Sequence, residues 1–193
     1  DLADGVATDS SRNVYVVGYT YGGLDGNNNT GGSDLFVVKY NSSGTKQWTK
    51  QLGTASEDVA YGLTVDSSSH IYVTGYTKGN PWNLTGNPDN ETNSGNSDAF
   101  ILKYYDNSTL HWTELLGTSS SDKAEEGRSV TVDSASPSSY LYLTGLTEGA
   151  LYGSNFGNFD VFLAKYNLAG TKQWSDTVRQ MGTSSGEQGY GVT

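Results

Sequence analysis

Few side chains of this 193-residue sequence have the types and spacing that catalysis needs. Cysteine is absent, which excludes disulfides, thiolate metal sites and cysteine nucleophiles. The two histidines, His70 and His111, stand at positions of an internal repeat that hold Asn13 and Gln47 in its first copy. Neither has a nucleophile motif beside it, and the sequence contains no P-loop, HExxH pattern or nucleophile elbow. We therefore predict that the protein is not an enzyme.

One segment has residue types that suit a hard cation. The run Asp25-Gly26-Asn27-Asn28-Asn29 offers carboxylate and amide oxygens, which are the ligands that calcium prefers. It lacks the acidic pattern of an EF-hand loop, so a plain turn is the favoured interpretation. Calcium, with Asp25 as a ligand, is the one cofactor that the sequence suggests.

The insertion at 78–97 is the least repetitive part of the chain, and loops on rigid scaffolds often carry function. Its Trp82 either folds back onto its own sheet or stacks on a sugar, with Asp89 and Glu91 as polar ligands. Three further aromatic residues occupy the corresponding loops: Tyr21, Tyr152 and Phe156. A carbohydrate-binding module is therefore the alternative function. A glycosidase-like enzyme is a second alternative, and it would need two loop carboxylates about 5–10 Å apart.

The sequence also contains possible acceptors for N-linked glycans. The asparagines of five N-x-[ST] triplets fall in predicted turns or loops: Asn28, Asn41, Asn83, Asn90 and Asn107. A glycan acceptor must be accessible, and glycosylation occurs in secreted proteins. We expect glycans at some of these positions if the host glycosylates secreted proteins.

Charge and hydropathy exclude two classes of partner. The formal net charge is −10 and the pI is about 4.4, so no basic surface is expected to bind nucleic acid or an anionic membrane. The apolar runs are only a few residues long, too short to insert into a bilayer. Glycans and other copies of the same kind of unit remain as candidate partners.

The elements that position these residues repeat three times. Two landmarks recur with spacings of 64 and then 62 residues: Lys39, Lys103 and Lys165, and Trp48, Trp112 and Trp174. Each repeat contains four short runs rich in Val, Tyr, Phe and Thr, which in the first repeat lie near 5–9, 14–20, 34–41 and 46–53. Consecutive apolar residues such as Phe36-Val37-Val38 indicate strands covered on both faces.

This pattern predicts an all-β fold of β-propeller blades, each a four-stranded antiparallel sheet. A β-sandwich is the alternative, but it would not need a Trp at the same phase of each repeat. We expect the three repeated tryptophans to pack between blades. The repeated lysines are expected to pair with carboxylates or to extend along apolar surface. The aspartates that precede strands are expected to accept hydrogen bonds from turns: Asp9, Asp66 and Asp133, and Asp34, Asp98 and Asp160.

The repeat resembles the SBBP, or seven-bladed beta-propeller, repeat. The resemblance is carried by the phrases V-x-D-x-x-x-x-[VI]-Y-V-x-G-Y-T, D-x-F-[VI]-x-K-Y and K-Q-W-x-x-x-L-G-T. The second repeat contributes these matching residues: Asp66, Tyr72, Gly75, Thr77, Asp98, Phe100, Lys103, Tyr104, Trp112 and Gly117. The resemblance implies an extracellular or cell-surface propeller module and gives no biochemical activity.

The expected division is blade 1 at 1–56, blade 2 at 57–121, blade 3 at 122–185, and the first strand of a fourth blade at 186–193. Three blades do not close a ring, because propellers have about four to eight. Either the chain is an excerpt of a longer repeat protein, which we favour, or its terminal strand or blade faces pair with another subunit. The predicted function is a non-enzymatic, structural or adhesive role at a cell surface or in an extracellular assembly, including a filament.

Overall fold

The computed structural model describes residues 1–80, 93, 95–118, 123–133, 139–174 and 178–193. Its regular elements are twelve β-strands in three four-stranded sheets, and the described residues contain no helix. The first sheet, blade 1, holds β1 (Leu2–Thr8), β2 (Val14–Thr20), β3 (Asp34–Tyr40) and β4 (Lys46–Leu52). Blade 2 holds β5 (Asp58–Val65), β6 (Ile71–Thr77), β7 (Asp98–Tyr104) and β8 (Leu110–Leu116). Blade 3 holds β9 (Glu125–Asp133), β10 (Tyr140–Thr147), β11 (Asp160–Asn167) and β12 (Val178–Met181).

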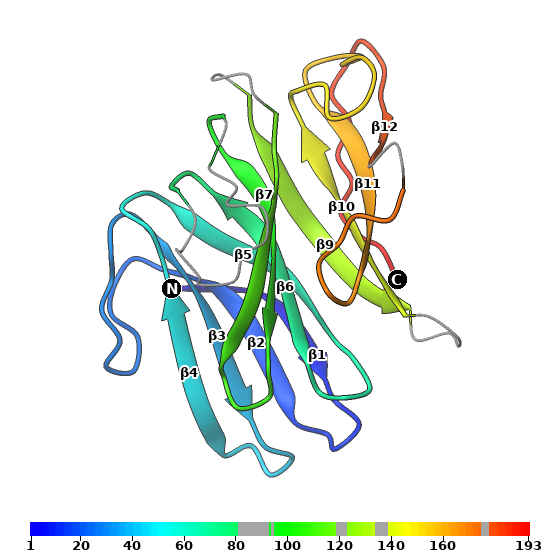
Figure 1. The fold of residues 1–193 in the computed structure, drawn as a ribbon. Coiled ribbons are helices and arrows are strands. Elements are labelled where there is room, and N and C mark those ends of the chain that lie inside the picture. Colours follow the sequence, from blue (N-terminus) through cyan, green and yellow to red (C-terminus); the bar gives the residue numbers. More distant parts are fainter. Residues whose placement is uncertain (81–92, 94, 119–122, 134–138, 175–177) are drawn as a thin grey trace.

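Each blade is an antiparallel meander in which consecutive strands are neighbours (Figure 1). The strand register also repeats from blade to blade: Tyr15 pairs with Lys39 in blade 1, and Tyr72 pairs with Lys103 in blade 2. The predicted all-β propeller architecture of four-stranded antiparallel blades is thereby confirmed. One boundary was wrong, since the first strand begins at Leu2 and not near residue 5.

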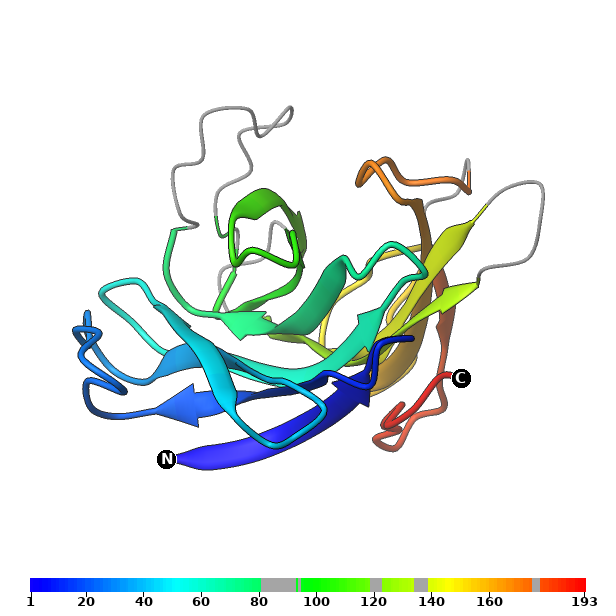
Figure 2. The same cartoon turned by 90° about the horizontal axis from the view of Figure 1, so that it is seen from below.

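The first strands of the blades lie side by side, with β5 between β1 and β9, and the remaining strands of each blade fan outward (Figure 2). Two hydrophobic clusters fill the spaces between neighbouring sheets. One joins blade 1 to blade 2 through residues such as Tyr15, Val37 and Phe100, and the other joins blade 2 to blade 3 through Ile101 and Phe162. Blade 2 is therefore covered on both faces.

Coverage changes the burial of equivalent strands. Every residue of β7 is buried, whereas β11 alternates between buried and partly exposed positions. The two strands have similar sequences, but β3 of blade 1, at the other end of the stack, is buried from Asp34 to Lys39, so the greater exposure is a feature of blade 3. The consecutive apolar residues correctly predicted a sheet covered on both faces in blade 2.

A glycine in the second strand of each blade has a steric reason. A Cβ on Gly75 would lie 1.8 Å from the carbonyl oxygen of Val59, and one on Gly18 would lie 1.9 Å from that of Leu2. These close approaches accompany a bulge in the adjacent first strand, between Ala60 and Gly62 in blade 2. The glycine of the Y-V-x-G-Y-T phrase is thus required by the passage of the neighbouring backbone.

The fourth repeat begins but does not form the predicted strand. Glu187 donates its backbone N–H to the carbonyl of Phe159 at 2.8 Å, and Val192 donates to Ser129 Oγ at 3.2 Å. No residue of 187–193 is in a strand or a bridge, because the described chain supplies no second strand with which this segment could pair. It therefore lies against blade 3 as an isolated extended segment.

Blade 3 also ends differently. The predicted fourth strand contains Trp48 in β4 and Trp112 in β8, but Trp174 precedes the shorter strand β12. The two strand-borne tryptophans are held by a turn of the following blade, as described below. Trp174 has no following blade in the described residues.

Candidate functional site: the blade junctions

The repeated tryptophans bind the backbone of the next blade. Trp48 Nε1 donates to the carbonyl oxygen of Asp106 at 3.1 Å, and Trp112 Nε1 donates to that of Leu168 at 3.3 Å. Asp106 and Leu168 occupy the same position of their repeats, in the turn between the third and fourth strands. Each junction is thus closed by a turn of one blade docked on an indole of the blade before it, and the predicted packing between blades is confirmed for Trp48 and Trp112.

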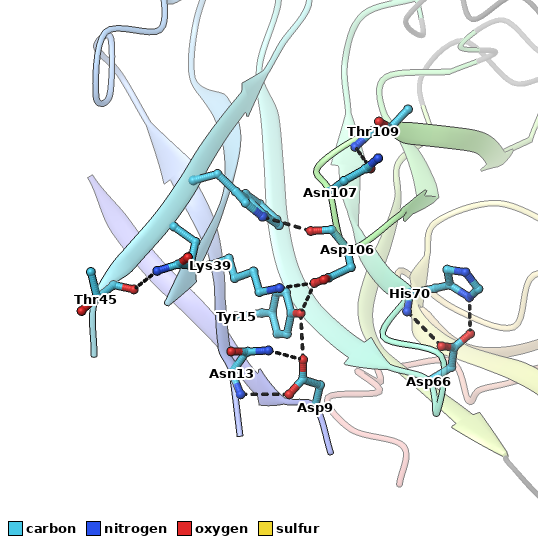
Figure 3. A network of polar contacts seen from close by, with 12 residues as sticks. Asp9, Asn13, Tyr15, Lys39, Thr45, Asp66, His70, Asp106, Asn107 and Thr109 are labelled. Atoms are coloured by element: carbon cyan, nitrogen blue, oxygen red, sulfur yellow. Dashed lines mark hydrogen bonds and ion pairs between the residues drawn. The ribbon is translucent and has the colours of Figure 1, made fainter. Parts of the chain in front are cut away.

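The repeated lysine approaches the same turn. Lys103 Nζ donates to the carbonyl oxygen of Leu168 at 3.1 Å. At the first junction Lys39 forms an ion pair with the carboxylate of Asp106, and Tyr15 donates its hydroxyl to that carboxylate at 2.7 Å (Figure 3). Lys39 is buried while the side chain of Asp106 is half exposed, so this ion pair is partly desolvated. The expected pairing of a repeated lysine with a carboxylate is confirmed for Lys39.

A second carboxylate holds the buried tyrosine from its own blade. Tyr15 donates to Asp9 at 3.1 Å and Tyr72 donates to Asp66 at 3.0 Å. Asp9 also accepts the N–H of Asn13, and Asp66 accepts the N–H of His70 at 2.9 Å (Figure 3). These contacts confirm the predicted turn role of both aspartates.

The electrostatics of this pair follow from burial and hydrogen bonding. Burial and the adjacent carboxylate raise the pKa of Tyr72. Burial also acts to raise the pKa of Asp66, but the hydrogen bonds from His70 and Tyr72 outweigh it and the pKa is lowered overall. The aspartate is therefore held ionised, as an acceptor that fixes the tyrosine and the hairpin.

His70 serves the same structure. Its Nδ1 lies 2.8 Å from Asp66 Oδ2, where Asn13 places its amide in blade 1. His111 stacks on Tyr105 with ring centroids 4.5 Å apart. Both histidines thus stand among turn and packing residues.

A third carboxylate connects consecutive blades at the opposite rim. Asp58, at the start of β5 in blade 2, accepts from the N–H and the hydroxyl of Thr54, which lies just after β4 of blade 1, at 2.6 and 2.9 Å. Its other oxygen accepts from the hydroxyl of Thr77 in its own blade at 2.5 Å. At the second junction Glu125 contacts Thr118 and Thr147 in the same way.

These linking carboxylates are fully buried, and burial raises the pKa of both Asp58 and Glu125. Near each end of the described chain, an acid at the equivalent position makes only one of these two threonine contacts. Asp1 accepts from the hydroxyl of Thr20, and Glu187 accepts from the N–H and the hydroxyl of Thr183. The sequence contained a signal for this group, an acid four to seven residues after the threonine of each Leu-Gly-Thr or Met-Gly-Thr phrase, but our sequence analysis did not identify it.

The bulged residues of the first strands form a further charged group near the centre of the fan. The guanidinium of Arg128 lies 4.2 Å from the ring centroid of Tyr61 and makes an ion pair with Glu126 at 2.5 Å. Burial, followed by the charge of Glu126, raises the pKa of Tyr61 to about 12. Burial also raises the pKa of Glu126 despite Arg128. The charges of Arg128 and Glu126 neutralise each other, and the contact of Arg128 with Tyr61 joins blade 3 to blade 2.

The predicted glycan acceptors are partly described. Asn28 and Asn107 are exposed, and Asn41 is partly exposed in a turn where its side chain accepts from Ser43 and Thr45. All three lie between strands, as predicted. Asn83 and Asn90 lie outside the described residues.

The other predicted ligand residues give no site that the structure can describe. Trp82, Asp89 and Glu91 lie outside the described residues. Asp25 makes an ion pair with Lys46 at 2.6 Å and accepts from Thr49 at 2.5 Å, contacts that compete with a cation for its carboxylate. Among the described residues, no group of three His, Cys, Asp or Glu side chains could hold a metal ion. No helix in that part of the chain is long and apolar enough to cross a bilayer.

The stacked blades and their repeated junctions define a β-propeller repeat protein. A family model described as SBBP, beta-propeller repeat, matches residues 3–25 and 47–82. This match supports the SBBP-type repeat that the motifs indicated, in the first repeat and at the start of the second. The chain is also 26% identical over 185 residues to an uncharacterized WD repeat-containing protein, L264, of Acanthamoeba polyphaga mimivirus. That match covers 83% of this chain but 13% of the relative, so the chain spans about an eighth of the protein that it resembles.

Proposed function

We propose that the protein is a non-enzymatic structural or adhesive module that acts at a cell surface or in an extracellular assembly. Its recurrent polar groups are used for cohesion. The tryptophans and lysines dock turns, the aspartates hold hairpins, and the linking carboxylates join consecutive blades. The blades thereby form a rigid support for the loops at their rims.

The observation that carries the proposal is the incomplete cover of blade 3. Ile101 of blade 2 is 1% exposed, whereas its counterpart Leu163 in blade 3 is partly exposed. Tyr142 is likewise less buried than Tyr72. A hollow of about 550 Å³ opens on this face, between Tyr142, Leu163 and the end of the chain at Val192. A surface built for cover by another blade supports an assembly role.

Three features support the extracellular part of the proposal. The chain is acidic and free of cysteine, so it needs no reducing compartment. Asn28 and Asn107 are exposed in N-x-[ST] triplets. The net negative charge also opposes random pairing of exposed strand edges such as β1 and β4.

Electron microscopy of the purified chain tests the structural role. We expect copies joined end to end, as rods, rings or fibres, with more association at higher protein concentration. Uniform single particles at all concentrations would contradict an assembly role. Labelling of intact cells that carry the protein, with a reagent unable to cross membranes, tests the location. Protection of its lysines until the cells are opened would contradict surface exposure.

A carbohydrate-binding role is the second candidate. It is favoured by exposed aromatic side chains on the loops that connect the second and third strands of a blade. Tyr21 follows β2, and Tyr152 and Phe156 follow β10. All three are exposed, as a stacking surface for a sugar requires. A glycan array probed with the chain and with its Tyr152→Ala variant tests this role. Retention of any signal by the variant would remove Tyr152 from the site.

A further inference from the structure

We propose that blade 3 carries a preformed socket, made by Trp174, Lys165 and Tyr142, that binds the Asn41–Thr45 turn of a second copy of this chain. The inference rests on the proposed assembly role and assigns its contacts. The turn would place the carbonyl oxygen of Ser42 against Trp174 Nε1 and Lys165 Nζ. Copies would then associate head to tail, a contact that generates rings or filaments.

The first argument is that the same contact already occurs twice within the chain. Asp106 fills the socket of blade 1 and Leu168 fills that of blade 2, each through its backbone carbonyl. Because a carbonyl oxygen is the shared acceptor, the side chain at this position is free to vary. Ser42 is the residue at this position in the first repeat.

The second argument is the shape of the turn. In blade 1 the N–H of Asn41 donates to the carbonyl of Thr45 at 2.9 Å. The docked turns are closed identically, by Tyr105 to Thr109 and by Asn167 to Thr171, both at 2.9 Å. The turn of blade 1 is also accessible in the structure, since residues 42–45 are all exposed. It is therefore an accessible copy of the two segments that fill the internal sockets.

The third argument is that the socket of blade 3 keeps its geometry without an occupant from a following blade. The rings of Tyr142 and Trp174 have centroids 6.4 Å apart and planes at 57°. The filled sockets show 6.2 Å and 55° for Tyr15 with Trp48, and 6.1 Å and 51° for Tyr72 with Trp112.

The cation is also in place. Lys165 Nζ lies 5.4 Å from the ring centroid of Tyr142, against 5.4 Å for Lys39 over Tyr15 and 5.2 Å for Lys103 over Tyr72. The same nitrogen lies 3.6 Å from the ring centroid of Tyr140, so it is held beside aromatic faces rather than spread into solvent. A socket that needs no rearrangement binds at a lower entropic cost.

Residues 189–193, which follow blade 3, would contribute to the association by strand exchange. A Cβ on Gly189 would lie 2.8 Å from Thr144 Oγ1, much as one on Gly127 would meet Thr74 Oγ1 in blade 2. Residues 189–193 thus occupy the place of the first strand of a next blade. They would pair with β2 of the second copy in place of its β1, which is exposed along most of its length. Glu187 would then accept from Thr20 of that copy, as Asp58 does from Thr77.

A gain-of-function variant gives the sharpest test. At the first junction the carboxylate of Asp106 binds Lys39 and Tyr15, and Ser42→Asp would give the free turn the same group. Sedimentation velocity over a concentration series should show that the native chain self-associates. Ser42→Asp should tighten this association at least tenfold, and Trp174→Phe, which removes the indole N–H, should weaken it about tenfold.

Two controls separate the specific contact from general effects. Asn28→Asp adds the same charge on an exposed loop and should leave association unchanged. Lys165→Met should cancel the gain from Ser42→Asp, as a double-mutant cycle requires of groups in contact. If neither Ser42→Asp nor Trp174→Phe changes the strength of association, the proposed socket is wrong, and copies that still assemble end to end do so by another contact. Chains that stay monomeric, Ser42→Asp included, would overturn both.

Discussion

Trp48 and Asp106 are separated by 58 residues of sequence, yet the indole N–H of the first donates to the backbone carbonyl of the second. The two residues belong to different blades, so the hydrogen bond crosses a junction between sheets. The equivalent pair, Trp112 and Leu168, repeats the contact one blade later. A single residue type at one phase of the repeat therefore serves both packing and registration of consecutive blades.

The first prediction compares two tryptophans of the same phase. Trp112→Ala should lower the free energy of unfolding by about 3–5 kcal/mol, because this side chain is 5% exposed and lies between two blades. Trp174→Ala should cost less, about 1–2 kcal/mol, because Trp174 is partly exposed and no blade follows it among the described residues. Urea denaturation of the two variants at a concentration where the chain is monomeric measures the difference. Equal losses would show that blade cover does not set the burial energy.

The second prediction concerns the glycine of the second strand. Gly75→Ala should destabilise the fold by at least ~3 kcal/mol, because the new methyl group would meet the backbone of Val59, which cannot move without breaking strand pairing. Gly22→Ala is the matched control, since a Cβ there meets nothing within 4 Å. Thermal melting distinguishes them. A Gly75→Ala melting curve that overlays the native one would contradict the close approach of β5 and β6.

The third prediction uses two aspartates whose pKa values are shifted in opposite directions. The pKa of Asp66 is lowered on folding, so its ionised form contributes stability that is present above its ordinary value of 3.8 and lost as the pH falls further. The pKa of Asp58 is raised by burial, so its contribution is greatest below 3.8 and is lost as the pH rises through the higher folded value.

Asparagine variants isolate the two effects. As the pH is lowered from 7 toward 3, the native chain should lose stability relative to Asp66→Asn and gain stability relative to Asp58→Asn. Urea titrations of the three proteins at several pH values give the two differences. Curves that change with pH in the same direction would refute the assignment of opposite shifts.

The fourth prediction concerns modification. Secreted from a eukaryotic host, the chain should carry glycans at Asn28 and Asn107, whose side chains are exposed. Replacement of each asparagine by glutamine should remove one glycan from the intact mass. A secreted product with the bare mass of 20.6 kDa would rule these acceptors out.

The fifth prediction concerns Asp25. Because Lys46 and Thr49 hold its carboxylate, we expect the melting temperature to be unchanged by a calcium chelator. A fall in the melting temperature on chelation, reversed by added calcium, would instead establish a structural ion.

Much of the architecture could be predicted because it depends on local residue patterns. Runs such as Phe36-Val37-Val38 predicted buried strands, and the structure buries all three residues. The period of Trp48 and Trp112 specified the blade as the repeating unit. The turn role of Asp66 followed from the preference of aspartate for strand ends.

The junction contacts could not be predicted because they depend on how one blade sits on the next. Nothing local in the sequence shows that Trp48 meets the backbone of Asp106, since any residue supplies a carbonyl. The linking role of Asp58 needs Thr54 and Thr77 together, and these threonines approach only after two blades have formed. The state of 186–193 depends on a partner strand that the described chain lacks.

The absence of native cysteine allows the central claim, that the uncovered face of blade 3 receives blade 1 of another copy, to be tested by directed cross-linking. Chains carrying Ser42→Cys and chains carrying Gln173→Cys, at an exposed position next to Trp174 that leaves the socket intact, would be mixed and treated with a short bismaleimide. The account predicts a covalent dimer from this mixture and little from Asn28→Cys mixed with Gln173→Cys. No dimer in the first mixture, or equal yields from both, would contradict it.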